Sequence, residues 1–417
     1  MSSLFFCQNN ENDFHFTGVC AVPIILYMRD ITYGRGRRDL AYAMIVSLYR
    51  SNPGLAMDAL RLCASKYGSW CDIKYFCRYV SEHSLIYIDD EMKDRMIDGA
   101  IDILIYQLNM DYAIWTDALS EHLDNLRTVP RPIGREILSY AAKWVPREKS
   151  AMGWLFDRIV ERWGNKDHYN SRYKREFRKM ISELNRELGT VEIKQCSGEI
   201  HNIMYEQIPI RALVNQYRTF ANLEVYPKNS MVNIGYRSFE HMCRNLVKIA
   251  LLRDDGRYDD MLNHIWSKNQ TNYSSHDIFP IVDISAGCDH AIGLGILIAQ
   301  NSSHGKLILS EHDAHSITVG FGDSFTSIIA RIRPFLSGVT DSRLDAAVES
   351  VNGMRVVVLS ENGNVSNEAI HWFFGSSTCD CDYTYCDSMY MLSHYANGGT
   401  AHDYIQMVLG SDRYKSN

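Results

Sequence analysis

The chain has 417 residues, more than one hydrophobic core usually serves, so two or three domains are favoured and we expect two. Its composition, 46% hydrophobic and 22% charged, is typical of a folded protein and excludes a disordered one. The formal net charge of −7 excludes a chain that is basic throughout, so any site for a polyanion has to come from local positive charge.

The cysteines and the apolar runs predict an intracellular protein. Eleven cysteines stand at irregular spacings, and the first residues lack the basic start and the apolar run of a signal peptide. No apolar stretch reaches the roughly 18–20 residues that cross a bilayer. We therefore expect a cytoplasmic protein that does not bind a membrane.

Between residues 20 and 266, apolar residues recur at helical spacing, which predicts an all-helical array behind a tail of residues 1–19. The predicted helices include Leu40–Tyr49, Leu55–Tyr67, Met92–Leu108, Ile133–Lys143, Met152–Trp163, Tyr173–Leu188, Ile210–Ala221 and Ser238–Leu252. No clean internal repeat is visible, so we expect an irregular helical-repeat array.

A polar stretch, residues 267–275, is predicted to be a linker, and short apolar runs then alternate with helix-like segments through residues 276–417. The predicted strands are Ile278–Ile284, Lys306–Leu309, Met354–Leu359, Ile370–Phe374 and Met389–Leu392. The predicted helices are Ala291–Gln300, Ser324–Arg333, Arg343–Val351 and Ala401–Leu409. Such alternation predicts an α/β domain with a doubly wound, mainly parallel sheet and a ligand site at the carboxyl ends of its strands.

The run Pro280–Cys288, with the sequence PIVDISAGC, resembles the first strand and metal loop of von Willebrand A domains, whose motif is Asp-x-Ser-x-Ser. This resemblance implies oxygen ligands for Mg²⁺. The corresponding residues are Asp283, Ser285, Thr340 and Glu361. The site is degenerate, because Gly287 stands for the second serine and Glu361 for an aspartate. We therefore favour a loop in which Asp283 and Ser285 cap the next helix, and we expect no cofactor, with Mg²⁺ as the alternative.

Segments nearer the N-terminus carry a second resemblance. They are Tyr27–Leu40, Tyr67–Asp72, Ala141–Glu148, Val191–Cys196 and Tyr205–Pro209. They look like a poorly characterised family of plants, fungi and large DNA viruses that joins a helical region to a von Willebrand A-like domain. This architecture is similar in outline to the Ro autoantigen, where a ring of helical repeats binds RNA. The resemblance implies an RNA or ribonucleoprotein partner, an A-like domain that acts as structural closure and partner surface, and a place in the virion for a viral member.

Local charge favours the same kind of partner. From Arg131 to Arg186, fourteen Lys or Arg stand against seven Asp or Glu, and aromatic residues are interleaved. Basic side chains neutralise phosphates, and aromatic rings stack on unpaired bases. The candidate RNA contacts are Arg35, Arg37, Arg38, Lys143, Arg147, Lys149, Arg172, Lys174, Arg175, Arg178 and Lys179. The alternative is that these residues form the solvated face of ordinary amphipathic helices.

Two clusters offer metal-binding side chains without the spacing of a metal site. Residues 311–315, with the sequence EHDAH, are expected to form an exposed loop. The other cluster consists of Cys379, Cys381, Cys386, His371 and His394, and we expect its cysteines in a surface loop. The pair Gly293 and Gly295 is expected to permit close packing of a helix on the sheet.

No serine-hydrolase elbow, zinc-protease motif or phosphate-binding loop is present in the sequence, so we expect a non-enzymatic protein. The leading hypothesis is RNA binding by the helical region. One alternative is a protein–protein scaffold, such as a viral structural or assembly component, whose strand-end loops grip a partner without a metal. The other alternative is magnesium-dependent ligand binding at the degenerate site.

Overall fold

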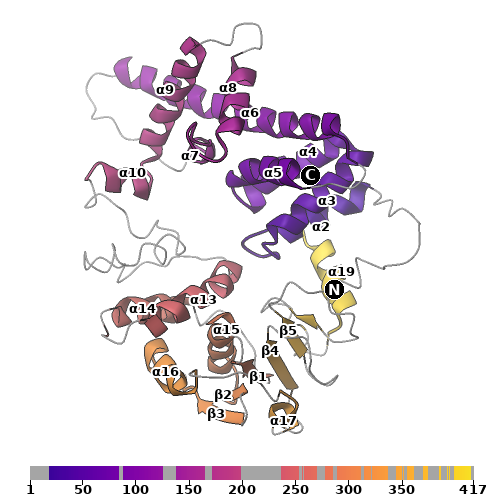
Figure 1. Ribbon diagram of the computed structural model, residues 1–417, viewed down its shortest axis with the longest axis vertical. Helices are drawn as coiled ribbons and strands as arrows, with labels where there is room; N and C mark the ends of the chain where they lie inside the picture. Colours follow the sequence, from indigo (N-terminus) through magenta and orange to yellow (C-terminus); the bar gives the residue numbers. More distant parts are fainter. Residues whose placement is uncertain are drawn as a thin grey trace. The chain divides into compact units, whose positions relative to one another are not determined.

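The computed structural model consists of two compact units, a helical unit within residues 15–203 and a sheet unit within residues 204–415 (Figure 1). The architecture is therefore helical in its first half and α/β in its second. The structure describes residues 18–83, 88–124, 138–164, 171–198, 236–252, 256, 258–269, 278–284, 289–310, 314–320, 322–336, 344–349, 351, 355–360, 370–373, 385–386, 392, 394 and 399–414.

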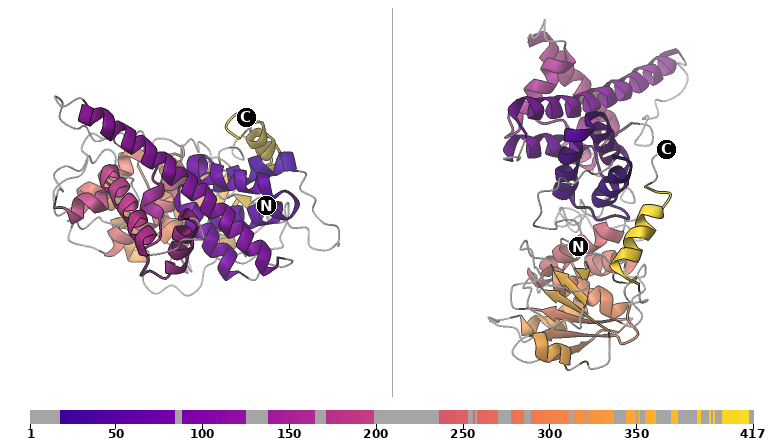
Figure 2. Two further views of the ribbon diagram at one scale, coloured as in Figure 1. Left: turned by 90° about the horizontal axis from the view of Figure 1, so that it is seen from above. Right: turned by 90° about the vertical axis from the view of Figure 1, so that its right-hand side faces the viewer.

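The helical unit is organised along one long helix, α6. The other helices that the structure describes in this unit are α2 (Gly18–Arg29), α3 (Arg38–Ser51), α4 (Pro53–Leu62), α5 (Cys71–Glu82), α7 (Ala141–Trp144), α8 (Gly153–Trp163), α9 (Ser171–Leu188) and α10 (Val191–Cys196), with a π-helical turn η1 (Cys63–Tyr67). Helix α6 (Asp90–Asp124) packs against α4, α5, α7, α8 and α9. Figure 2 shows it as one uninterrupted rod.

Local sequence signals explain where α4 begins. The side chain of Asn52 accepts a hydrogen bond from the backbone N–H of Leu55 at 3.1 Å, which satisfies one of the free donors at the helix start. Pro53 follows at the first helical position, where its missing N–H costs no helix bond. The predicted helix Leu55–Tyr67 is helical over its whole length, with its last residues in the π-helical turn.

The sheet unit contains a six-stranded sheet of order β3-β2-β1-β4-β5-β6. The strands are β1 (Ile278–Asp283), β2 (Lys306–Ser310), β3 (Ala314–Thr318), β4 (Arg355–Ser360), β5 (Ile370–Phe373) and β6 (Tyr385–Cys386). All neighbouring pairs are parallel except β2 with β3, which is antiparallel. The first strand therefore lies at the centre, with β2 and β4 on its two sides.

Helices lie on both faces of this sheet. The helices after β1 are α15 (Asp289–Gln300), α16 (Phe325–Ile332), α17 (Leu344–Glu349) and α19 (Ala401–Gly410), with a 3₁₀ turn η6 (Arg333–Phe335). On one face, a Cβ atom at Gly295 of α15 would lie 2.4 Å from Val282 of β1, so only glycine permits this approach, as the sequence predicts. On the other face, Leu344 and Ala347 of α17 pack in a buried cluster with Ile281.

Two helices that the sequence assigns to the helical array pack instead on the sheet unit. They are α13 (Tyr236–Leu252) and α14 (Asp259–Asn269). A Cβ atom at Gly293 of α15 would lie 2.6 Å from that of Cys243, so α13 packs directly on α15. The Trp266 indole donates to Gln300 Oε1 at 2.6 Å. The division of the chain thus falls before α13, and α14 continues into the predicted linker as far as Asn269. Amphipathic periodicity shows that one face of a helix is buried, but it does not show which element covers that face.

Three other predicted elements differ from the structure. Of Ile133–Lys143, the described residues are helical only from Ala141. Residues 314–315, predicted as loop, begin the antiparallel edge strand β3. Leu392, predicted as strand, is helical. The predicted helix Ile210–Ala221 lies outside the described residues.

No helix in the described part of the chain has the length and apolar character that a bilayer crossing needs.

Candidate functional site

Three adjacent parallel strands each end in a buried polar side chain. Asp283 ends β1, Ser310 ends β2 and Ser360 ends β4, and their exposed fractions are 1%, 0% and 3%. Asp283 is in register with Ser310, and the Ser360 hydroxyl donates to Asp283 Oδ2 at 2.7 Å. Side chains alternate between the faces of a sheet, so Asp283 shares the face of Ile281, which is covered by α17. We call these three residues the strand-end row.

The hydroxyl of Ser310 distinguishes the strand-end row from an ordinary sheet interior. Its Oγ atom is buried and has no hydrogen-bond partner among the described residues. A buried polar atom without a partner costs about 1–3 kcal/mol, so native structures rarely keep one without a reason. Among the described residues, the Ser310 hydroxyl oxygen therefore has unused hydrogen-bonding or ligating capacity.

Only part of the predicted metal site falls within the described structure. Asp283 belongs to the strand-end row, whereas Ser285, Thr340 and Glu361 lie outside the described residues. Over the described ranges, no group of three or more His, Cys, Asp or Glu side chains is arranged to hold a metal ion.

The predicted cysteine and histidine cluster is divided in the same way. His371 lies on β5 and Cys386 on β6, with His371 in register with Tyr385. His394 Nε2 lies 3.1 Å from the Thr400 carbonyl oxygen. Cys379 and Cys381 lie outside the described residues.

The turn between α7 and α8, residues 147–153, is tightly folded, and we call it the basic turn. The Ser150 N–H donates to the Arg147 carbonyl at 3.0 Å, and the Gly153 N–H donates to the Ser150 carbonyl at 2.8 Å. A Cβ atom at Gly153 would lie 2.2 Å from the Glu148 carbonyl oxygen, so a larger residue cannot occupy this position without moving the turn. These contacts fix the backbone that carries Arg147 and Lys149.

Glu148 attaches the basic turn to α9. Its carboxylate pairs with Lys174 and Arg178, and Lys174 also pairs with Asp157 of α8 at 2.7 Å. The hydrogen bond from Lys174, together with Arg178, holds the pKa of the Glu148 carboxyl below its usual range. Lys174 thus links the basic turn to α8 as well as to its own helix, α9.

Three basic residues, each next in sequence to Glu148 or to Lys174, are exposed and have no acidic partner in the described part of the chain. They are Arg147, Lys149 and Arg175. We call these three residues, together with Lys174 and Arg178, the basic cluster. Two acids, Glu148 and Asp157, pair with Lys174 and Arg178 of this cluster. The cluster therefore has an excess of about three positive charges, five against two, on the surface of the helical unit.

Other basic residues between Arg131 and Arg186 are neutralised by acidic side chains distant in sequence. Arg158 of α8 pairs with Asp94 and Asp98 of α6, and Arg162 pairs with Asp98 and Asp102. The three aspartates are spaced four residues apart and so lie on one stripe of α6. This α6–α8 ladder shows that the charge excess counted along the sequence overstates the charge of the surface.

Other candidate RNA contacts are also paired. Lys143 pairs with Glu192 of α10 at 2.9 Å, Arg172 with Glu176 at 2.8 Å and Lys179 with Glu183 at 3.8 Å. The latter two pairs join residues four apart on α9, as the solvated-face interpretation expects.

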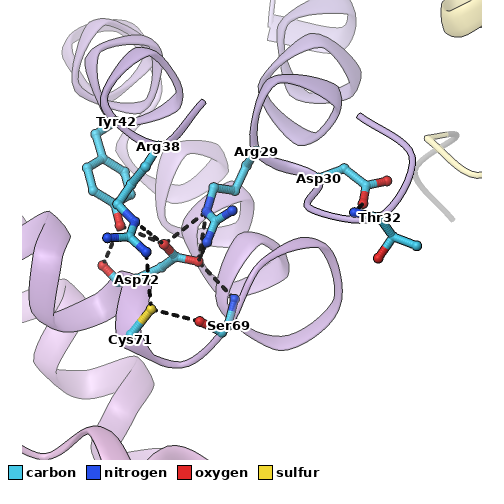
Figure 3. A network of polar contacts seen from close by, with 8 residues as sticks. All are labelled: Arg29, Asp30, Thr32, Arg38, Tyr42, Ser69, Cys71 and Asp72. Carbon is cyan, nitrogen blue, oxygen red and sulfur yellow. Dashed lines mark hydrogen bonds and ion pairs between the residues drawn. The ribbon is translucent and has the colours of Figure 1, made fainter. Parts of the chain in front are cut away.

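A buried ion pair organises the start of the helical unit (Figure 3). Arg29 Nη2 lies 2.8 Å from Asp72 Oδ2, and both side chains are buried. The same carboxylate accepts from the Tyr42 hydroxyl at 2.7 Å and from the Ser69 N–H at 2.9 Å. Burial alone would lower the pKa of Arg29, but the Asp72 charge and hydrogen bonds outweigh it and the pKa is raised. Burial, with the Asp72 charge, raises the pKa of Tyr42.

One member of the predicted arginine cluster, Arg38, belongs to this network. Arg38 Nε lies 3.5 Å from Asp72, and its guanidinium lies over the Tyr75 ring. Arg35 is buried, with an exposed fraction of 8%, and Arg37 is exposed. Of the three arginines, only Arg37 is placed mainly in solvent.

The Arg29–Asp72 pair also brings together two segments of the family resemblance, Tyr27–Leu40 and Tyr67–Asp72. A Cβ atom at Gly68 would lie 2.2 Å from Asp72 Oδ2, so the glycine is needed where the second segment meets the first. These motifs therefore serve the fold of the helical unit.

Comparison with known proteins gives distant similarities. No family model matches the sequence. An uncharacterised protein, L728, of Acanthamoeba polyphaga mimivirus is 22% identical over 327 residues, which cover 69% of this chain and 53% of that protein. The chain thus spans about half the length of this curated relative. Among solved structures, the Ro (RSR) protein of Deinococcus radiodurans is 12% identical, with 94% of this chain and 95% of that chain covered and a TM-score of 0.42.

Proposed function

We propose that the protein is a non-enzymatic RNA-binding protein that engages RNA through the basic cluster of its helical unit. The observation that carries the proposal is the exposure of Arg147, Lys149 and Arg175 without acidic partners in the described structure, while neighbours such as Arg158 are neutralised. Cations with no protein partner can replace the counterions of a phosphate backbone, which is the main source of affinity for nucleic acids.

The proposal assigns the sheet unit a supporting role, as a von Willebrand A-like domain that provides structural closure and a protein-binding surface. Its central β1 ends in Asp283, the position of the first residue of the family's metal motif. The antiparallel β3 at the edge of an otherwise parallel sheet fits the same assignment.

Filter binding of the full chain to RNA at two salt concentrations tests the proposal. We expect the dissociation constant to rise steeply with salt, with a logarithmic slope of about 0.7 per phosphate contacted on a single strand. The double variant Arg147→Glu/Lys149→Glu should weaken binding at least tenfold, roughly the effect of reversing two contacts. The matched control is Arg61→Glu/Arg78→Glu, which reverses two exposed charges on α4 and α5. A salt-independent constant, or equal losses in both variants, would contradict the proposal.

A second candidate function is cation-dependent binding of a partner at the strand-end row. The Ser310 hydroxyl, which has no partner among the described residues, favours it, because hydroxyl and carboxylate oxygens are the ligands that Mg²⁺ prefers. Asp283 and Ser310 would hold the ion, which supplies an open position for a partner's carboxylate. Calorimetry of the full chain with Mg²⁺ and Mn²⁺ tests this. Heat that disappears in Asp283→Asn supports the site, and absence of heat in the unaltered chain rules it out.

A further inference from the structure

An exposed tryptophan follows the basic turn directly. Trp154 is the second residue of α8, and 41% of its surface is exposed, whereas Leu155 and Phe156 after it are buried in the core. Among the described residues, no ring or hydrogen-bond donor or acceptor engages the indole of Trp154. An exposed indole offers a flat apolar face on which a ligand ring can stack, and at Trp154 this face stands next to cations.

The contacts of α8 place Trp154 beside the basic cluster. The backbone of Gly153, its chain neighbour, lies against the Glu148 carbonyl at the centre of the basic turn. Asp157, three residues after Trp154 and therefore on the same face of α8, is held by Lys174, which also holds Glu148. Trp154 thus follows the basic turn directly in the chain and shares a face of α8 with Asp157, the residue that Lys174 of α9 holds.

We infer that Trp154 and the basic cluster together form a site for an unpaired nucleotide, with the base stacked on the indole and the flanking phosphates bound by Arg147, Lys149 and Arg175. This inference rests on the proposed RNA binding and specifies its ligand as a single-stranded segment. The three cations are carried by a turn and a helix that their own contacts hold in place, so binding does not require the backbone to be ordered first.

The indole discriminates between unpaired and paired RNA. In an A-form duplex both faces of each base are covered by neighbouring bases, so a ring on the protein surface has no face to stack on. An unpaired base exposes its faces, and stacking on an aromatic side chain is favourable for all four bases. The site should therefore prefer single strands to duplexes and show little base preference.

The experiment measures binding of a fluorescent oligouridylate, about ten nucleotides long, and of an RNA duplex of equal length by anisotropy at fixed salt. We expect the single strand to bind more tightly than the duplex. Trp154→Ala should weaken single-strand binding roughly tenfold or more, and Trp154→Phe, which keeps a stacking ring, should restore most of it. Tyr106→Ala, at an exposed aromatic on α6 with an exposed fraction of 66%, is the matched control and should change nothing.

The outcomes separate this inference from the proposed function. If the duplex binds as tightly as the single strand, or Trp154→Ala binds normally while Arg147→Glu/Lys149→Glu does not, the protein binds RNA by charge alone and the stacking site is disproved. If neither RNA binds, the proposed function fails and the inference with it. Quenching of tryptophan fluorescence by the oligouridylate, present in the unaltered chain and reduced in Trp154→Phe, provides a direct measure of stacking at this residue.

Discussion

Arg29 and Asp72 are separated by 43 residues in the sequence and form a bidentate ion pair in the core of the helical unit, with Nε 2.9 Å from Oδ1 and Nη2 2.8 Å from Oδ2. Their side chains are nearly inaccessible to water. The pair joins the end of α2 to the start of α5. Each buried charge is compensated by the opposite charge of its partner.

Removal of one partner should therefore destabilise the helical unit strongly. Asp72→Ala leaves the Arg29 charge buried, and we expect a loss of about 3–5 kcal/mol. The double variant Arg29→Met/Asp72→Leu removes both charges and should lose less than Asp72→Ala. Urea-dependent hydrogen exchange at the amides of α2–α5 measures the helical unit separately from the sheet unit. A double variant that is less stable than the single variant would contradict the expectation.

The strand-end row predicts opposite effects for its two serines. Ser310→Ala removes a buried hydroxyl that has no partner in the described structure and should leave stability unchanged or raise it by about 1 kcal/mol. Ser360→Ala removes a donor to the buried Asp283 carboxylate and should cost about 1–3 kcal/mol. Thermal unfolding of both variants in metal-free buffer is the measurement. Equal destabilisation by both would show that Ser310 has a role the contacts do not reveal.

The Glu148 carboxyl should titrate below its ordinary pKa of 4.5, because Lys174 and Arg178 stabilise its charged form. A carboxyl whose native pKa is lowered contributes stability above the unfolded pKa and loses it as the pH falls through the native value. The contacts of Glu148 should thus be intact at neutral pH and lost only below about pH 4.5. Carbon-detected NMR titration measures the midpoint, and Lys174→Met should move it up toward 4.5.

Neutralising Glu148 should also strengthen RNA binding. Glu148→Gln removes the acid that occupies Lys174 and Arg178 and raises the positive charge of the basic cluster by one unit. We expect a several-fold lower dissociation constant and a steeper dependence on salt, since more cations are available to phosphates. Asp58→Asn on α4, which frees Arg61 elsewhere on the unit, is the control and should have little effect.

Cysteine accessibility gives a test of the helical packing that does not depend on function. Burial raises the pKa of Cys77 to about 12, so this thiol stays protonated and enclosed at pH 8, whereas Cys196 is exposed. Brief treatment with iodoacetamide followed by peptide mass spectrometry should modify Cys196 and leave Cys63, Cys71, Cys77 and Cys243 intact. Early modification of Cys77 would mean that α5 is not packed as described.

The elements that were predictable from sequence are those with a strong local signal. The strands β1 and β4 are nearly continuous short apolar runs, as strands buried on both faces are, and the glycines of α15 indicate close packing on the sheet. The partner of a helix carries no comparable signal. For that reason the periodicity of α13 and α14 could not show that they pack on the sheet unit.

The candidate sites were predictable only in part, for two physical reasons. The positive charge of α8 is neutralised by α6, some sixty residues earlier in the chain, so a count over one segment could not show it. A single serine at the end of a strand does not stand out in a sequence, although one pattern pointed to the strand-end row. The apolar runs of β2 and β4 both end in Leu-Ser, at residues 309–310 and 359–360, as the run of β1 ends in Asp283.

The α6–α8 ladder has a practical consequence for dissecting this protein. A fragment that begins after α6 would keep Arg158 and Arg162 but lose Asp94, Asp98 and Asp102, the acids that occupy them. Such a fragment would attract nucleic acids of any sequence or strandedness, because two normally silent guanidinium groups would face solvent. The affinity of this fragment for nucleic acid would reflect the loss of α6 and not the native surface. Only a chain that retains α6 can show whether the protein prefers one kind of nucleic acid to another.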